Sequence, residues 1–231
     1  MKVVSLVPSV TETLLDWGVR PAAVTRFCEA DGIPTVGGTK NPDIDGIIAL
    51  GADLVVMDKE ENRQADALLL EEAGVTVFAT HVRSAADVEP TLTNLAAALG
   101  VTNVETKVEL GREPDPVLSV WVPIWRRPWM TINGTTYGSS VLFAAGLENV
   151  CRDLADAYPL CPPEMAADLE PDRVLAPSEP YPFSERHRRE LEEVAPVTFV
   201  DGRDLFWWGT RTAGAIGRLR GLARDLAGAQ G

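Results

Sequence analysis

Histidine and cysteine are scarce in this chain, which has only two histidines and three cysteines among its 231 residues. Neither His81 nor His187 belongs to an H-E-x-x-H or H-x-H pattern, so a zinc or di-iron site has little support. The chain also lacks the G-x-S-x-G, G-x-x-x-x-G-K-[ST] and G-x-G-x-x-G motifs of hydrolases, P-loops and dinucleotide sites. We therefore predict no catalytic residues, no metal site and no catalytic cofactor, and expect that the chain is not an enzyme.

Positive charge is also in short supply, with 21 Lys and Arg against 34 Asp and Glu and a formal net charge of −13. This balance argues against nucleic-acid binding, which needs clustered Lys and Arg to neutralise phosphates. The one dense basic stretch, residues 186–189, lies among glutamates and indicates a solvated helix face. No apolar run approaches the roughly 20 residues that span a bilayer. We expect a monomer that does not span the membrane and that binds a small molecule.

The three cysteines, Cys28, Cys151 and Cys161, are odd in number and lack the spacing of metal ligands. Cys151 and Cys161 could pair in an oxidising compartment, although reduced, partly buried thiols are the expected state. Met1 leads directly into the first predicted strand and leaves no room for a leader segment. We expect a cytoplasmic location if Met1 is the native start, and an extracytoplasmic one if a leader was removed.

Two stretches follow the same plan of strand, loop and short helix. Residues 3–18 read VVSLVPSVTETLLDWG, and residues 117–146 read VLSVWVPIWRRPWMTINGTTYGSSVLFAAG. In open α/β sheets, ligands bind where the carboxyl end of a strand opens into a helix N-terminus. The duplication predicts two α/β lobes, at residues 1–83 and 117–231, with a connecting helical segment at 84–116 and a ligand cleft between the lobes.

Alternating strand and helix patterns predict mainly parallel sheets in both lobes. We expect a capping box from Ser9 and Glu12 at the first helix. The expected strands cover 3–7, 23–26, 53–57, 75–79, 117–122, 173–176 and 197–200. The expected helices cover 11–17, 43–50, 64–73, 84–99, 104–112, 138–145, 163–168, 184–193 and 211–227.

Aromatic residues gather in the loops after predicted strands. Trp125, Trp129, Trp207 and Trp208 belong to such loops, and Phe27 follows the second strand. Trp, Tyr and Phe rings suit large, flat, partly apolar ligands. The same indoles could instead fill the space between the lobes, and this alternative stays open. Trp121, inside a strand, is expected to belong to the core.

Five segments, in this order, resemble the helical-backbone (class III) substrate-binding proteins of ABC importers. The segments are VVSLVPSVTETLLDWG, VTRFCEADGIPTVGGTKNPDIDGIIALGADLVV, VWVPIWRRPWMTINGTTYGSSVLFAAGLENV, LAPSEPYPFSERH and VDGRDLFWWGTR. This family supplies importers with cobalamin, haem or ferric siderophores. The parts IWRRPWMT and SEPYPF are most similar to the cobalamin-binding branch. The resemblance covers most of the chain.

The resemblance implies two Rossmann-like lobes joined by a backbone helix, with a corrinoid (cobalamin-like) or chelated-metal ligand between them. It also implies an ABC permease as partner, whose arginines dock on Asp45 and Glu164. From the residues alone, these two acids could equally be solvated carboxylates favoured at helix starts. The implied ligand-binding residues are Pro8, Ser9, Phe27, Asp58, Trp125, Trp129, Tyr137, Trp207 and Trp208.

Two other functions stay open. A cytoplasmic relative outside transport would bind and buffer a cofactor, leaving Asp45 and Glu164 without a docking role. An enzyme that modifies a corrinoid or metal chelate would have His81, at the end of a predicted strand, as its evident acid–base group. His81 could also be an ordinary loop histidine.

Overall fold

The computed structural model describes residues 1–111 and 114–229 and divides the chain into two compact units. Unit 1 comprises Met1–Val82, Asp87–Val108 and Trp208–Thr210, and unit 2 comprises Arg83–Ala86, Glu109–Trp207 and Arg211–Gly231. Each unit therefore includes a short segment from the other half of the sequence.

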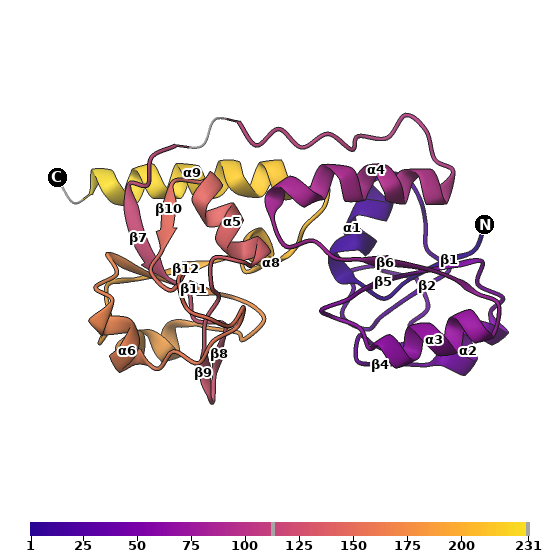
Figure 1. Ribbon diagram of the computed structural model, residues 1–231, viewed down its shortest axis with the longest axis horizontal. Coiled ribbons are helices and arrows are strands. Elements are labelled where there is room, and N and C mark those ends of the chain that lie inside the picture. The colour runs from indigo at the N-terminus through magenta and orange to yellow at the C-terminus, as the bar shows by residue number, and fades with distance from the viewer. Residues whose placement is uncertain (112–113, 230–231) are drawn as a thin grey trace. The chain divides into compact units, whose positions relative to one another are not determined.

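The sheet of unit 1 has four parallel strands in the order β2-β1-β5-β6. They are β1 (Val3–Ser5), β2 (Ala23–Val24), β5 (Leu54–Asp58) and β6 (Thr76–Thr80). Helices α2 (Ile44–Ala49) and α3 (Gln64–Glu72) cover one face of this sheet, and α1 (Pro8–Asp16) and α4 (Val88–Leu99) cover the other (Figure 1). Because both faces are covered, the apolar runs VVS and LVVMD are buried along their whole length.

The sheet of unit 2 repeats this arrangement with four parallel strands in the order β10-β7-β11-β12. They are β7 (Leu118–Trp121), β10 (Leu147–Asn149), β11 (Arg173–Pro177) and β12 (Val197–Val200). Helices α5 (Tyr137–Ala144) and α9 (Thr212–Gly228) lie on one side of the sheet and α6 (Pro163–Asp168) on the other (Figure 1). Its core contains Trp121, Val174 and Leu191.

Shorter elements complete the two units. Unit 1 holds the paired strands β3 (Gly37–Gly38) and β4 (Asn41–Pro42). Unit 2 holds the hairpin of β8 (Trp125–Arg126) and β9 (Trp129–Met130), and the short helices α7 (Arg188–Leu191) and α8 (Arg203–Phe206). The 3₁₀ turns η1 (Ala85–Asp87) and η2 (Glu185–His187) precede α4 and α7. No helix in the two described stretches is long and apolar enough to cross a bilayer.

The predicted α/β class with parallel sheets is confirmed. The helix predicted at 104–112 is wrong for residues 104–111, which form no helix, and Arg112 lies outside the described residues. These residues run extended: the side chain of Glu89 accepts the N–H of Val108, and the carbonyl of Glu105 accepts the indole N–H of Trp17. Partners outside the segment therefore replace the intrahelical hydrogen bonds.

The capping box predicted from Ser9 and Glu12 is also wrong. Helix α1 begins at Pro8, with Val7 as its N-cap and no side-chain hydrogen bond to the cap. Proline suits the first helical position because the N–H that it lacks would have no intrahelical partner there. Ser9 thus lies inside the first turn rather than ahead of it.

Candidate functional site

The hairpin β8–β9 extends from the carboxyl end of β7 and carries two tryptophans. Trp125 pairs with Met130, and Arg126 pairs with Trp129. The Trp129 ring lies 5.8 Å from the ring of Trp121, which is fully buried in the core. The hairpin is thus anchored in unit 2 through one of its two tryptophans.

Five rings from this hairpin and from the segment after β11 form an aromatic cluster: Trp125, Trp129, Tyr181, Phe183 and His187. Trp129 stacks on Phe183 with an interplanar angle of 11° and ring centroids 5.9 Å apart. Tyr181 lies 4.7 Å from Phe183 and contacts Trp125 edge-on at 5.7 Å. The segments IWRRPWMT and SEPYPF, far apart in the sequence, thus build one cluster.

The aromatic cluster has a buried base and an open rim. Phe183 and His187 are each 5% exposed, whereas Trp125 is 43% exposed. Trp129 and Tyr181 are partly buried. A surface with one open indole and two partly open rings, held by buried rings behind them, is preorganised for a flat apolar ligand.

His187 holds the base of the cluster as a neutral imidazole. Its Nδ1 accepts the backbone N–H of Ser184 at 3.1 Å, which requires an unprotonated nitrogen at that position. Burial lowers the pKa of His187, and the nearby charges of Arg186 and Arg126 lower it further. The Arg126 guanidinium forms an ion pair with Glu190 at 2.7 Å and so ties the hairpin to α7.

Trp207 follows α8 in unit 2, and two arginines lie near its ring. The guanidinium groups of Arg203 and Arg211 lie 5.9 and 5.6 Å from its ring centroid. The hydroxyl of Tyr137 donates to the Trp207 carbonyl at 3.3 Å, and burial raises the pKa of this tyrosine. Burial also raises the pKa of Glu179, while a hydrogen bond to Trp207 opposes that shift. Tyr137 thus positions the Trp207 backbone from inside the unit.

The expected ligand-binding residues of unit 1 differ in how open they are. Phe27 is 54% exposed, and the guanidinium of Arg26 lies 4.8 Å from its ring centroid. Ser9 is 3% exposed, and its hydroxyl has no hydrogen-bond partner within the described chain. Pro8 precedes it at the start of α1, and Trp208 is 5% exposed. Of these four residues, Phe27 is therefore open to solvent, Pro8 is partly buried, and Ser9 and Trp208 are buried.

Asp58 has an internal structural role in unit 1. Its carboxylate accepts the Thr80 hydroxyl at 2.7 Å and the backbone N–H of Glu60 at 2.9 Å. The side chain is 6% exposed. Asp58 therefore fixes the turn after β5, and its oxygens are already engaged.

The two expected docking acids are both exposed and both lie in the first turn of a helix. Asp45 is in α2, whose N-cap is Asp43, and Glu164 is in α6, whose N-cap is Pro162. Each unit thus presents one carboxylate at a helix start, where the helix dipole favours negative charge.

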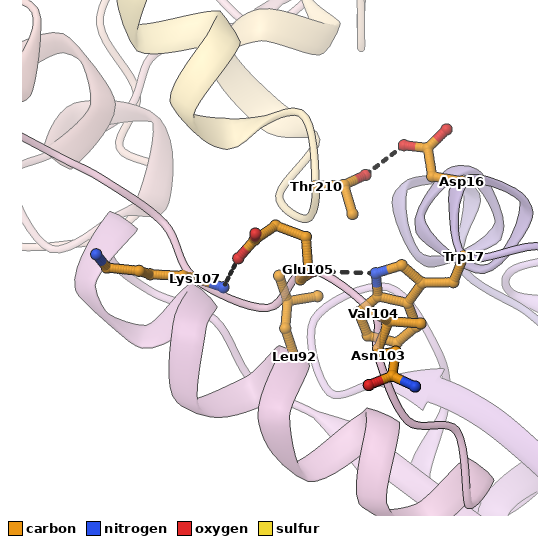
Figure 2. Close-up of a pocket in the computed structure, with 8 residues that line it drawn as sticks. All are labelled: Asp16, Trp17, Leu92, Asn103, Val104, Glu105, Lys107 and Thr210. Carbon is orange, nitrogen blue, oxygen red and sulfur yellow. Dashed lines mark hydrogen bonds between the residues drawn. The ribbon is translucent and has the colours of Figure 1, made fainter.

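A cavity of about 410 Å³ lies within unit 1. Figure 2 shows the Trp17 indole and the Glu105 backbone meeting at its edge, where the indole N–H donates at 3.0 Å. Its lining residues are Asp16, Trp17, Leu92, Asn103, Val104, Glu105, Lys107 and Thr210. None of these is an expected ligand-binding residue, so the cavity reflects how the extended 103–107 segment packs on α1 and α4.

His81 makes only a loose exposed contact, with its Nε2 3.8 Å from a Glu60 carboxylate oxygen. Within residues 1–111 and 114–229, no group of three or more His, Cys, Asp or Glu side chains is arranged to hold a metal ion. His81 belongs to unit 1, and the aromatic cluster belongs to unit 2.

Trp125 and Trp129 were predicted as ligand-binding residues, and the structure links them through intermediate rings: Trp125 contacts Tyr181, Tyr181 contacts Phe183, and Phe183 stacks on Trp129. Sequence reasoning did not assign a ligand-binding role to Tyr181, Phe183 or His187. The segment SEPYPF could have indicated a role for Tyr181 and Phe183, because both follow the end of the predicted strand 173–176.

Solved structures with the same fold include three binding proteins. The periplasmic vitamin B12-binding protein BtuF of Vibrio cholerae has a TM-score of 0.80 and 16% identity, with 97% of each chain covered. The periplasmic haem-binding protein RhuT from Roseiflexus sp. RS-1 has a TM-score of 0.80 and 20% identity, with 98% of each chain covered. Staphylococcus aureus IsdE, solved in complex with haem, has a TM-score of 0.71 and 13% identity, covering 96% of this chain and 98% of that one.

Neither a protein-family model nor a curated protein sequence matches the chain. At identities this low the structural likeness establishes the fold. The chain has the architecture of the periplasmic vitamin B12- and haem-binding proteins, over nearly its full length and theirs, which confirms the predicted resemblance at that level.

Proposed function

We propose that the chain is the substrate-binding protein of an ABC-type importer and that it binds a corrinoid (cobalamin-like) or chelated-metal ligand, with a corrinoid as the first candidate. Haem and a ferric siderophore are the alternative ligands of the same class. The observation that carries the proposal is the aromatic cluster, with its open Trp125 on a fixed ring base. The shared fold of vitamin B12- and haem-binding proteins supports the same class of function.

The aromatic cluster would provide the apolar contact to the ligand. Trp125 and Tyr181 contact each other edge to face, with an interplanar angle of 78°, and both rings are at least partly open to solvent. A macrocycle with a flat apolar body and polar edge groups would cover both rings. The buried partners Phe183 and His187 would keep the rings in place, which reduces the entropy lost on binding.

In unit 1, taken by itself, Ser9 and Phe27 are the contrasting candidates. The Ser9 hydroxyl is buried at the start of α1 without a hydrogen-bond partner, so it would bond to a polar substituent only if the groups that cover it moved aside. Phe27, which is largely exposed, would cover part of the ligand's apolar body.

Trp207 would bind the ligand's polar periphery, because two guanidinium groups lie close to its ring. Tyr137 would act as a positioning residue for Trp207 through its hydrogen bond to the Trp207 carbonyl. Asp58 would hold the turn after β5 rather than contact the ligand.

Transport would further require an extracytoplasmic location and a permease. The exposed carboxylates of Asp45 and Glu164, one in each unit, would form charge-assisted hydrogen bonds with permease arginines. The role is binding and delivery, with no chemical step on the ligand.

The test is to titrate the purified protein separately with cyanocobalamin, haemin and a ferric hydroxamate, following tryptophan fluorescence and calorimetric heat. We expect at least one ligand to bind with a dissociation constant below about 100 µM, equivalent to about −5.5 kcal/mol. If all three bind more weakly than this, the proposed function is contradicted for this ligand class.

A further inference from the structure

We infer that Cys151 and Cys161 form a disulfide bond that closes the 151–161 segment against the base of the aromatic cluster. Their sulfur atoms lie 3.8 Å apart, and both side chains are fully buried. Disulfide bonding needs about 2.05 Å between the sulfurs. Forming the bond therefore requires the two sulfurs to move closer by about 1.7 Å. This inference goes beyond the proposed function, since it concerns the covalent structure of the chain with or without ligand.

The surroundings of the pair favour this bond. Both cysteines belong to the hydrophobic core that contains Trp121 and Phe183, and Trp129 packs against that core. The segment between them is already attached at both ends to the chain that continues from the hairpin. The N–H of Cys161 donates to the Trp129 carbonyl at 3.1 Å, and the N–H of Gly134 donates to the Arg152 carbonyl at 2.9 Å. The fold therefore places the two sulfurs side by side.

The oxidant is a second disulfide, R–S–S–R, supplied by a small thiol couple such as glutathione or by a dithiol oxidoreductase. The thiolate of one cysteine bonds to one sulfur of this oxidant and releases the other as a thiolate. The second cysteine then attacks the cysteine sulfur of the mixed disulfide and releases the second thiolate. The two cysteine protons end on the two released thiols, so the oxidant gains the two electrons that the cysteines lose. Because both sulfurs are buried in the folded unit, this exchange takes place before the segment closes completely.

Cys28 provides an internal comparison. Its sulfur shares hydrogen bonds with the hydroxyls of Thr11 and Thr25, each at 3.2 Å, and has no sulfur beside it in the described chain. We therefore expect Cys28 to remain a thiol under conditions that oxidise the other two cysteines.

The experiment is to refold the full chain in a mixture of oxidised and reduced glutathione, then denature it, alkylate it with N-ethylmaleimide and measure its intact mass. We expect one adduct on the refolded protein and three adducts after prior reduction. Closing a loop of about ten residues should also raise the melting temperature of the oxidised form by about 5–10 °C over the reduced form.

Three variants separate the sites. Cys151→Ser and Cys161→Ser should each carry two adducts and should melt at the same temperature with and without reductant. Cys28→Ser should carry none and should keep the reductant-dependent shift. Three adducts on the wild-type protein after oxidative refolding would overturn the inference. This count is made on denatured protein without ligand, so it decides the matter even if a variant fails to fold, and independently of the proposed function.

Discussion

Replacing Trp125 with alanine should weaken ligand binding while leaving the fold intact. The side chain is 43% exposed, so about 100 Å² of a ring that buries roughly 250 Å² remains available to a ligand. Covering half to all of that area at about 25 cal/mol/Å² contributes about 1.3–2.5 kcal/mol. Trp125→Ala should therefore raise the dissociation constant of the best ligand about ten- to seventyfold.

The assay is calorimetric titration of wild-type and variant proteins with the same ligand, together with thermal melting. Phe143 gives a matched control, because it is 42% exposed in the same unit and lies outside the aromatic cluster. Phe143→Ala should leave affinity unchanged. Equal affinity of wild type and Trp125→Ala, or equal losses from both substitutions, would refute the assignment of the cluster as the binding surface.

The remaining predictions concern pH, packing and docking. Burial lowers the pKa of His187 in the folded state, so the protein loses stability as the pH falls below the unfolded pKa of about 6.5. In urea unfolding at pH 7.5 and 5.5, the free energy of unfolding should therefore fall more for wild type than for His187→Gln. A Cβ at Gly202 would lie 2.5 Å from a neighbouring backbone oxygen, so Gly202→Ala should lower the free energy of unfolding by about 1–3 kcal/mol. A Cβ at Gly217, inside α9, would have no atom within 4 Å. Because alanine favours the helix more than glycine does, Gly217→Ala should raise the free energy of unfolding by about 0.5–1 kcal/mol in the same denaturation assay. Asp45→Ala and Glu164→Ala should leave ligand affinity unchanged but reduce stimulation of ATP hydrolysis by the reconstituted cognate permease.

Each of these tests has a contrasting outcome. If the free energy of unfolding of His187→Gln depends on pH as that of wild type does, the imidazole is not the cause of the acid-induced loss of stability. Equal stabilities for the two glycine variants would contradict the packing argument. Asp168→Ala changes an exposed carboxylate at the end of α6 instead of its first turn, so an equal loss of permease stimulation in that variant would point to general surface charge rather than docking.

The buried strands were the most predictable part of the fold. The runs around β1 and β5 are short, apolar and bounded by turn residues, and buried parallel strands have that pattern. The segment 104–110 was predicted wrongly although its sequence, VETKVEL, alternates apolar or β-branched residues with charged ones. That period of two favours extended chain, and the observed burial follows it, with positions 104, 106, 108 and 110 partly buried and the residues between them exposed.

The candidate site was only partly predictable, because its rings come from segments about 50 residues apart. The position of Trp125 in a loop after a strand was readable from the local pattern. That Tyr181 would lie 5.7 Å from it depends on β7 and β11 being neighbours in the sheet, which no local pattern specifies. The burial of Asp58 was similarly hidden, because its hydroxyl partner Thr80 comes from the next strand.

A crystal structure of the protein with whichever of the three ligands binds most tightly would show directly whether the aromatic cluster is the binding surface. We expect the ligand ring system to contact both Trp125 and Tyr181, and these side chains to lose most of their exposed area. A ligand bound elsewhere, with Trp125 as open as in the free protein, would contradict this expectation.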